Sequence, residues 1–396
     1  MKRCDDLSCV GVIAEFNPLH SGHKYLLEEA AKRGTVVCAL SGNFVQRGDT
    51  ALLEKRIRAK AALQNGADLV LELPVCWSMS TAQNFALGGI SLLDYLGCET
   101  VMFGSECGDT EKLYRTADIL ASDRFGKELA CFTERGMTFA AARESAAKLC
   151  GVPDGILNRP NNTLGVEYIT ATQKIGADMK FETVARMGAS HDSEETEHTH
   201  QSASVLRERL KCGDFEFASR FIPKNAMSLF GAEDLSDIHR LDRAVPAVLR
   251  MKGKSEFESL PDLSEGIENK LFSAVKLATD LDGLYNMIKT RRYTLARIRR
   301  LVLSAFIGID NAYFMKKPPY LRVLGFTPAG EALLKERSQN CPVPIIARAS
   351  DVKRLDDSAM GVFKTECRAT DLYALSLKRP LECGLEYTSK IIKTEC

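Results

Sequence analysis

The feature that most constrains this chain is a buried-strand pattern that runs directly into two histidines. Residues 9–16 form a short apolar run that ends at the turn-forming pair Asn17 and Pro18. A run of this length predicts a strand buried on both faces of a parallel sheet. After the turn, Ser21 is a favourable N-cap, and an apolar stripe at helical spacing follows in residues 22–33. The segment therefore predicts a strand, a sharp turn and a helix.

His20 and His23 share one face of the first turn of the predicted helix. Free backbone N–H groups and the positive end of the helix dipole create an anion site there, beside the carboxyl end of a strand. Two imidazoles can donate hydrogen bonds to phosphate oxygens as charge builds on them, so the pattern predicts attack on an α-phosphate with loss of pyrophosphate. The alternative is an ordinary pair of capping or surface histidines. The order of strand, turn and helix favours the phosphate site.

The first hundred residues alternate between apolar runs and helical patterns. Strands are predicted at 35–40, 67–73 and 98–103, with a further one at 179–185, and helices at 22–33, 54–65 and 81–96. Such alternation predicts an α/β fold with a doubly wound parallel sheet, Rossmann-like and nucleotidyltransferase-like. The active site is expected over the carboxyl ends of the strands.

The rest of the chain is predicted to be mostly helical. Residues 112–150 are expected to form an insertion or a cover over the site, and no strand is expected beyond about residue 221. Helices are predicted at 265–279, 284–289, 294–306 and 354–376. We therefore expect an ATP-binding catalytic domain over residues 1–220 and a mainly helical domain over residues 221–396, whose basic residues 289–300 make it the candidate RNA-binding part.

A second candidate phosphate site begins at residue 202. Ser202, Ser204 and Arg207 place two hydroxyls and a guanidinium in the first turns of a predicted helix. Hydroxyls, free N–H groups and a guanidinium suit the β and γ phosphates of ATP. A plain N-cap explains Ser202 equally well. The presence of the first motif favours the phosphate interpretation.

Three further residues follow predicted strands or turns. Gly104 permits close approach of an adenine or ribose, Asn161 offers a donor and an acceptor, and Arg186 supplies a cation or a stacking plane. Each is also compatible with a structural role.

A histidine-containing loop follows Arg186. His191, Asp192, His198 and His200 match no standard metal spacing, so a solvated loop is the better explanation and no protein metal site is expected. ATP is expected to arrive with Mg²⁺ held by its own phosphates and water.

A basic segment lies in the predicted helical half. Residues 289–300 hold many cations and no acid, and apolar residues at helical spacing allow the arginines to point outward, with Tyr293 available for stacking. This pattern predicts an RNA-phosphate footprint, although a solvated helix face remains the alternative. The candidate RNA-binding residues are Lys289, Arg291, Arg292, Arg297, Arg299 and Arg300.

The composition favours a cytoplasmic protein. The chain has 45% hydrophobic residues and a formal net charge of +1, and it contains no apolar run near eighteen residues. Its N-terminus lacks the apolar region of a signal peptide. The 13 cysteines are irregularly spaced without a Cys-x-x-Cys pair, which favours reduced thiols. We expect neither membrane insertion nor export.

Several motifs together resemble one family. Residues 20–23 (HSGH) resemble the HxGH signature of the HIGH-type nucleotidyltransferase superfamily, and residues 14–23 (AEFNPLHSGH) resemble the AEYNPFHNGH opening of the bacterial tRNA(Met) cytidine acetate ligase (TmcAL) family. The chain departs from that opening at Leu19 and Ser21, where Phe and Asn are usual. Further family segments resemble residues 41–49 (SGNFVQRGD), 103–106 (FGSE), 161–168 (NNTLGVEY) and 320–326 (YLRVLGF). The serine-rich turn at 202 is similar to the second signature of the superfamily.

The resemblance implies a specific reaction. A family member activates acetate with ATP as acetyl-adenylate and transfers the acetyl group to N4 of the wobble cytidine of elongator tRNA(Met), giving N4-acetylcytidine. The resemblance also implies a set of ATP contacts, namely Ile13, Ala14, Glu15, Phe16, Asn17, Pro18, Gly22, Leu26, Gly104, Asn161 and Arg186.

Two other functions stay open at this point. One is a nucleotidyltransferase of cofactor synthesis that acts on a small phosphorylated metabolite, and the other is a non-catalytic RNA-binding protein. No protein partner is inferred from the sequence.

Overall fold

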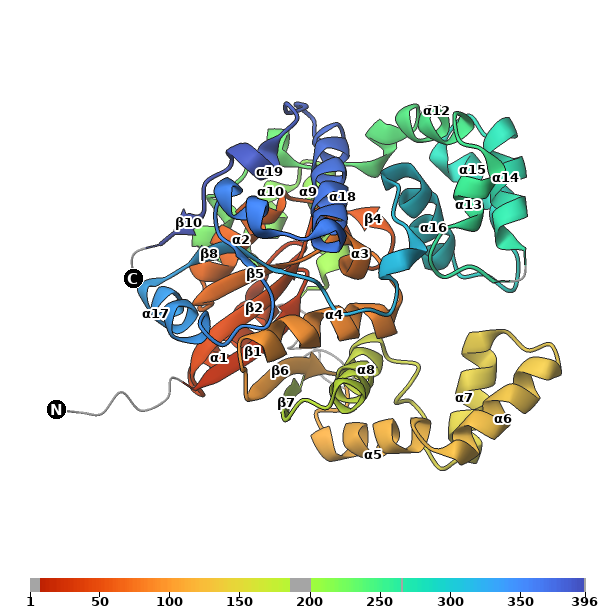
Figure 1. The fold of residues 1–396 in the computed structure, drawn as a ribbon, viewed down its shortest axis with the longest axis horizontal. Helices are drawn as coiled ribbons and strands as arrows, with labels where there is room; N and C mark the ends of the chain where they lie inside the picture. The colour runs from red at the N-terminus through yellow and green to blue at the C-terminus, as the bar shows by residue number, and fades with distance from the viewer. Residues whose placement is uncertain (1–7, 186–200, 265, 395–396) are drawn as a thin grey trace.

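A mostly parallel sheet forms the centre of the protein (Figure 1). The computed structural model describes residues 8–185, 201–264 and 266–394. The strand order is β10-β8-β5-β2-β1-β6-β7, with β9 beside β8. The parallel part of the sheet consists of β1 (Cys9–Ala14), β2 (Thr35–Ser41), β5 (Leu69–Leu73), β6 (Thr100–Ser105) and β7 (Lys180–Ala185). The predicted doubly wound α/β fold is confirmed.

Helices cover both faces of the sheet because successive strand side chains point to opposite faces. In β1, Ile13 packs into one hydrophobic core, whereas Val10 and Val12 pack into the other. A Cβ at Gly11 would lie 2.4 Å from Cδ1 of Leu93, so only glycine lets the helix above pack this closely on β1. One core holds α3 (Val75–Ser78), α4 (Ala82–Tyr95) and α8 (Pro160–Ile175), and the other holds α1 (Ser21–Ala31) and α2 (Lys55–Leu63).

The C-terminal part of the chain returns to the sheet. β8 (Leu321–Phe326) pairs antiparallel with β5, and β9 (Ile345–Ile346) and β10 (Ile392–Lys393) pair with β8. The expectation of no strand beyond about residue 221 is therefore wrong. The buried strand β8 contains Arg322, and this charge conceals its apolar run in the sequence. The division of the chain into domains at residue 220 stays a prediction.

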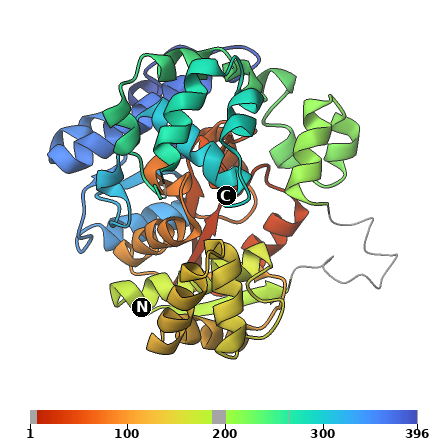
Figure 2. The ribbon, with the colours of Figure 1, turned by 90° about the vertical axis from the view of Figure 1, so that its right-hand side faces the viewer.

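Two helical groups project on the same side of the molecule. Figure 2 shows α6 and α7 at the bottom and the helices of residues 244–307 at the top. The predicted helical character of residues 112–150 is confirmed, and this group lies beside α8. The first group comprises α5 (Thr110–Leu120), α6 (Asp123–Glu134) and α7 (Phe139–Leu149). The second group comprises α12 (Ala244–Arg250), α13 (Lys254–Glu258), α14 (Ile267–Leu277), α15 (Leu281–Ile288) and α16 (Leu295–Ile307).

The remaining elements are a short hairpin and further helices, of which α18 packs into the interior. They are the hairpin of β3 (Phe44–Val45) and β4 (Asp49–Thr50), and the helices α9 (Ala203–Lys211), α10 (Phe215–Ser219), α11 (Lys224–Met227), α17 (Pro328–Arg337), α18 (Asp357–Ala374) and α19 (Leu385–Thr388). Within the described ranges, none of the helices is both long enough and apolar enough to cross a membrane.

Candidate active site

The strand order places a topological switch point between β1 and β6. From β1 the chain adds β2 and β5 on one side, and from β6 it adds β7 on the other. Connections that lead away in opposite directions leave a crevice at the carboxyl ends of two neighbouring strands, where α/β proteins bind ligands. The segment 15–23 follows β1 at this point, and Gly104 lies near the end of β6.

His20 and His23 form the N-terminal cap of α1. The Nδ1 atom of His20 accepts a hydrogen bond from the Gly22 amide at 3.1 Å, and Nδ1 of His23 accepts one from the His20 amide at 3.4 Å. The two rings are stacked, with centroids 3.8 Å apart. Because Nδ1 is an acceptor in both rings, the proton of each neutral imidazole is on Nε2. Both rings thus carry the N–H donor that a phosphate oxygen requires.

The turn between β1 and α1 is held tightly. Phe16 has a φ of 43°, in the left-handed region that a bulky residue adopts only under strain. The buried side chain of Asn17 accepts a hydrogen bond from the Leu52 amide at 2.7 Å through Oδ1. Several of the residues proposed as ATP contacts have buried side chains, namely Ile13, Phe16, Asn17, Pro18 and Leu26.

The second predicted motif meets the first one. Nη1 of Arg207 donates a hydrogen bond to the carbonyl oxygen of Asn17 at 2.8 Å, although the two residues are 190 positions apart. Ser202 caps α9 by accepting from the Val205 amide at 3.4 Å, and the hydroxyls of Ser202 and Ser204 are 2.9 Å apart. Burial lowers the pKa of Arg207, which nevertheless stays charged at neutral pH.

Glu15 is a carboxylate surrounded by cations. Its burial raises the pKa, while the hydrogen bond from the Gln46 amide and the nearby charges of Arg207, Arg58 and Arg47 lower it in part. The Gln46 amide donates to Oε1 of Glu15 at 3.0 Å. The turn after β1 and the segment after β2 are therefore joined directly.

Arg58 is a site residue that the sequence reasoning missed. This buried guanidinium donates to the carbonyl oxygens of Glu15 at 2.7 Å and Ser41 at 3.0 Å, and also to those of Gly42 and Leu53. It thereby fixes the ends of β1 and β2 relative to each other. The sequence offers one signal for this role, which is that Arg58 lies on the inward face of the helix predicted at 54–65.

The β6 side of the crevice is held by Glu106, which the sequence reasoning also missed. Its carboxylate accepts hydrogen bonds from Nδ2 of Asn161 at 2.6 Å and from the Asn162 amide at 2.9 Å. Oδ1 of Asn162 in turn accepts from the Glu106 amide at 3.0 Å. The segments FGSE and NNTLGVEY therefore form one structure next to Gly104. Arg186, His191, Asp192, His198 and His200 lie outside the described residues.

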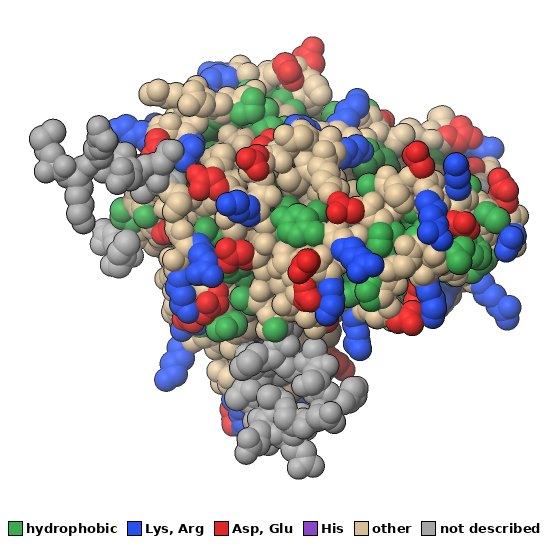
Figure 3. Space-filling model, turned by 90° about the horizontal axis from the view of Figure 1, so that it is seen from below, with side chains coloured by type: hydrophobic (Ala, Val, Ile, Leu, Met, Phe, Trp, Pro, Cys, Tyr) green, Lys and Arg blue, Asp and Glu red, His purple; other side chains and the backbone are tan. Residues whose placement is uncertain are grey.

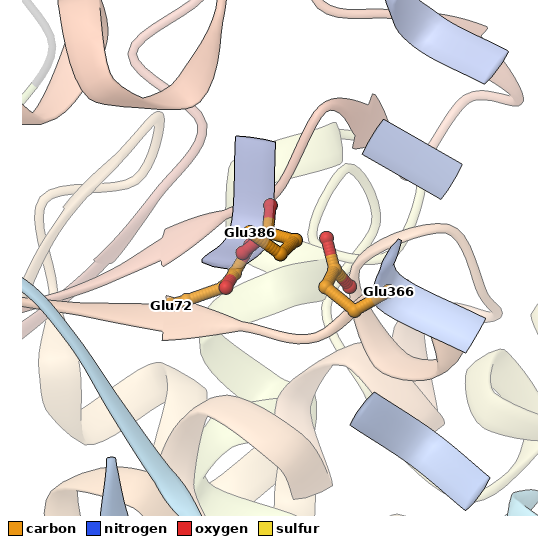
Figure 4. Close-up of side chains that lie close together, drawn as sticks. All are labelled: Glu72, Glu366 and Glu386. Carbon is orange, nitrogen blue, oxygen red and sulfur yellow. The ribbon is translucent and has the colours of Figure 1, made fainter. Parts of the chain in front are cut away.

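A group of three buried carboxylates lies at β5, where Glu72 of this strand points toward Glu366 of α18 and Glu386 of α19 (Figure 4). The ammonium group of Lys55 lies among them, 3.1 Å from Oε1 of Glu366, 2.6 Å from Oε1 of Glu386, and in contact with Glu72. Arg322 also pairs with Glu386 at 3.0 Å. The position that a metal ion would take is filled by a lysine, so this group is a structural ion cluster.

The basic segment divides into two parts. Lys289, Arg291 and Arg292 are exposed. Arg297 and Arg300 instead turn to the carboxylate of Asp262, at 3.4 Å and 3.5 Å.

Two further residues of the segment also lie inward. Arg299 lies over the ring of Tyr285, and the distance from its Cζ atom to the ring centroid is 5.5 Å. Tyr293 is only 8% exposed. The expectations that these arginines all point outward and that Tyr293 is available for stacking are therefore wrong, because folding brings residues from other elements against them.

Comparisons with known proteins identify the family. The family model for HIGH Nucleotidyl Transferase matches residues 7–384. The tRNA(Met) cytidine acetate ligase of Caldanaerobacter subterraneus subsp. tengcongensis is 36% identical, and that of Clostridium acetobutylicum is 33% identical, each over 98% of this chain and 100% of the relative.

A solved structure extends the likeness to three dimensions. The crystal structure of Thermotoga maritima TmcAL bound with alpha-thio ATP matches with a TM-score of 0.89 at 28% identity, over 98% of this chain and 100% of that one. With the family model spanning nearly the whole sequence and relatives above 30% identity at full length, the chain belongs to the HIGH nucleotidyl transferases and, among them, to the tRNA(Met) cytidine acetate ligase family.

Proposed function

We propose that this protein is an ATP-dependent ligase that forms acetyl-adenylate and transfers the acetyl group to N4 of the wobble cytidine of elongator tRNA(Met). The names of the full-length relatives support the substrate and the reaction. The hydrogen bond from Arg207 to Asn17 is the observation that supports the chemistry best, because it brings the two candidate phosphate motifs together at the switch point.

In the first step a carboxylate oxygen of acetate attacks the α-phosphorus of ATP, and the bond to the bridging oxygen of pyrophosphate breaks. His20 and His23 donate through Nε2 to the α-phosphate as its charge grows. Ser202, Ser204 and Arg207 hold the departing pyrophosphate. Gly104, Asn161 and Arg186 are assigned to the adenosine end of ATP, with backbone groups of residues 13–18 and 22 beside them. The protein contributes position and charge, without a covalent intermediate of its own.

In the second step the exocyclic amine of cytidine attacks the acetyl carbonyl, AMP leaves and the amine loses a proton. This amine is a weak nucleophile, which explains the use of an activated acyl-phosphate anhydride. The cytosine must leave its stacked position to reach the crevice.

The RNA is proposed to bind through the exposed end of the basic segment, Lys289, Arg291 and Arg292. On the described part of the face in Figure 3, acidic and basic side chains are interspersed. That described part of the face therefore shows no extended patch of positive charge.

Mg²⁺ is proposed to arrive with ATP, held by phosphate oxygens and water. The one group of three ligand side chains found among the described residues is the cluster that already contains Lys55. Mg²⁺ is therefore assigned no ligand among the described side chains.

The test is an incorporation assay with labelled acetate, ATP and tRNA. ATP-dependent label in elongator tRNA(Met), recovered as N4-acetylcytidine, is the expected result. Turnover of ATP with a phosphorylated metabolite and no labelled RNA would identify a nucleotidyltransferase of cofactor synthesis instead. Salt-sensitive tRNA binding without any turnover would identify a non-catalytic RNA-binding protein.

A further inference from the structure

Arg300 lies inside the basic segment but faces the catalytic half of the protein. Its side chain is 16% exposed, and Nη2 is 3.5 Å from Oδ2 of Asp262. Nη1 donates to the carbonyl oxygen of Gln46 at 3.3 Å. A guanidinium with this charge partner and this little exposure is a poor contact for an RNA phosphate. It is well placed to fix the β3–β4 hairpin.

The hairpin is also pressed against the backbone of α16. Gly48, between β3 and β4, has a φ of 72°, and a Cβ there would lie 2.6 Å from the Arg300 amide nitrogen and 2.7 Å from Cβ of Arg299. The Gly48 amide donates to the carbonyl oxygen of Val45 at 2.9 Å, which closes the turn. Only glycine satisfies both the backbone conformation and the close approach.

Gln46, in the turn of the hairpin, also holds the turn that leads to the histidines. The Gln46 amide donates to Oε1 of Glu15 at 3.0 Å, so the two sides of one peptide segment bind Arg300 and Glu15. Glu15 immediately precedes the strained residue Phe16, and its carbonyl oxygen is held by Arg58 at 2.7 Å. A shift of Gln46 is thereby passed to the end of β1, a few residues before His20.

We propose that Arg300 is a positioning residue for adenylation: through Gln46 it holds Glu15, and with it the turn that presents His20 and His23 to ATP. This inference rests on the proposed function. The sequence pattern groups Arg300 with the candidate RNA contacts. Under this proposal Arg300 serves adenylation, whereas Arg291 and Arg292 of the same segment serve RNA binding.

The test measures the two half-reactions separately in the full chain. Adenylation is followed without RNA, as acetate-dependent exchange of label between pyrophosphate and ATP, and RNA binding is followed as the affinity for tRNA(Met) over a range of salt concentrations. Arg300→Ala is expected to lower the kcat of exchange by about 10–100-fold, the range that small displacements at a reacting centre produce, with KM for ATP unchanged. Its affinity for tRNA and its salt dependence should equal those of the wild type.

Three further variants test the assignment of Arg300. Arg300→Lys retains a charged donor on a long side chain and should recover part of the lost kcat. Gly48→Ala should lower exchange in the same way, because the added methyl group forces the hairpin away from α16. Arg115→Ala removes an exposed arginine on α5 and should leave both measurements unchanged.

Two results would overturn the proposal. In one, Arg300→Ala keeps full exchange but loses tRNA affinity, with the slope of log K against log salt reduced by about 1, as expected for a phosphate contact. In the other, Arg300→Ala loses exchange and RNA binding equally, with a lower melting temperature and no recovery in the lysine variant. Absence of acetate-dependent exchange in the wild type would instead refute the proposed function itself.

Discussion

Each histidine of the HSGH motif caps the helix with one ring nitrogen and is proposed to contact ATP with the other. Nδ1 caps the helix, accepting from the Gly22 amide in one ring and the His20 amide in the other. Nε2 then carries the proton, from which a hydrogen bond to a phosphate oxygen is proposed. A substitution must therefore keep an acceptor at the position of Nδ1 to cap the helix and a donor at the position of Nε2 for the proposed catalytic role.

Replacing His23 by alanine is expected to remove adenylation, with a loss of about 10²–10³-fold in kcat, because one donor to the α-phosphate disappears. Acetate-dependent pyrophosphate exchange measures this loss. The affinity for tRNA should be retained. His239→Ala, which removes a half-exposed histidine beside Asp242, is the matched control. Undiminished exchange in the His23 variant would remove this residue from the mechanism.

Lys55 is the residue whose loss should affect stability most. Its burial lowers the pKa, but the carboxylates of Glu366, Glu386 and Glu72 outweigh burial and raise it, so the side chain stays charged. Lys55→Met would leave three buried carboxylates without their central cation. Breaking a buried ion pair from one side costs about 3–5 kcal/mol. Urea unfolding monitored by circular dichroism should show this decrease, and an unchanged midpoint would contradict it.

At the scale of elements, α16 and the segment before it differ in the exposure of their cations. Lys289, Arg291 and Arg292 are exposed, whereas Arg297 and Arg300 are bound to Asp262. The exposed part is therefore the part available to a polyanion.

Replacement of Arg291 by alanine should weaken tRNA binding and reduce the slope of log K against log salt by about 1 for the lost phosphate contact. Fluorescence anisotropy at several salt concentrations measures the slope. Arg297→Ala is the comparison within the same segment and should leave the slope unaltered, because this side chain also donates to the Asp262 carbonyl oxygen and the Ser264 hydroxyl. Equal slopes for the Arg291 variant and the wild type would contradict the proposed footprint.

The elements show what the sequence can and cannot predict. The predicted strand at 35–40 corresponds to β2, and the predicted helix at 22–33 to α1, because local apolar patterns specify both. β8 is missed because Arg322 is neutralised by Glu386, a partner 64 residues away.

The same limit applies to the site. His20, His23 and Arg207 are identified from local patterns, but Arg58 and Glu106 act on backbone groups of segments far along the chain. No spacing rule reveals such partners, and only the fold brings them together.

At the scale of the whole molecule, the C-terminal segment completes the centre of the protein. Glu386, in the short helix α19, contacts Lys55 of α2 and Arg322 of β8, and β10 adds the last strand to the sheet. Elements from the beginning, the middle and the end of the chain therefore share one buried cluster.

This cluster makes stability depend on pH. Burial alone raises the pKa of Glu386, but Lys55, Arg322 and Arg56 lower it to about 2 from its ordinary value of 4.5. A depressed folded-state pKa stabilises the protein above about pH 4.5, and this contribution is lost as the pH falls toward about 2. Glu72 acts in the opposite direction, because burial and the neighbouring carboxylates of Glu366 and Glu386 raise its pKa.

The free energy of unfolding, measured in urea at pH 6 and pH 3, should fall more steeply for the wild type than for Glu386→Gln, which cannot titrate at this position. Parallel pH dependences in the two proteins would show that Glu386 does not carry the effect.

The position of Glu386 also affects the order of events during synthesis. The HSGH motif leaves the ribosome early, but Lys55 meets its last carboxylate only after residue 386 has emerged. A nascent chain that ends before this point lacks one of the three carboxylates around Lys55 and the ion-pair partner of Arg322. Truncated translation products should therefore be recognised as unfolded and degraded, although every residue of the nucleotide motifs is present.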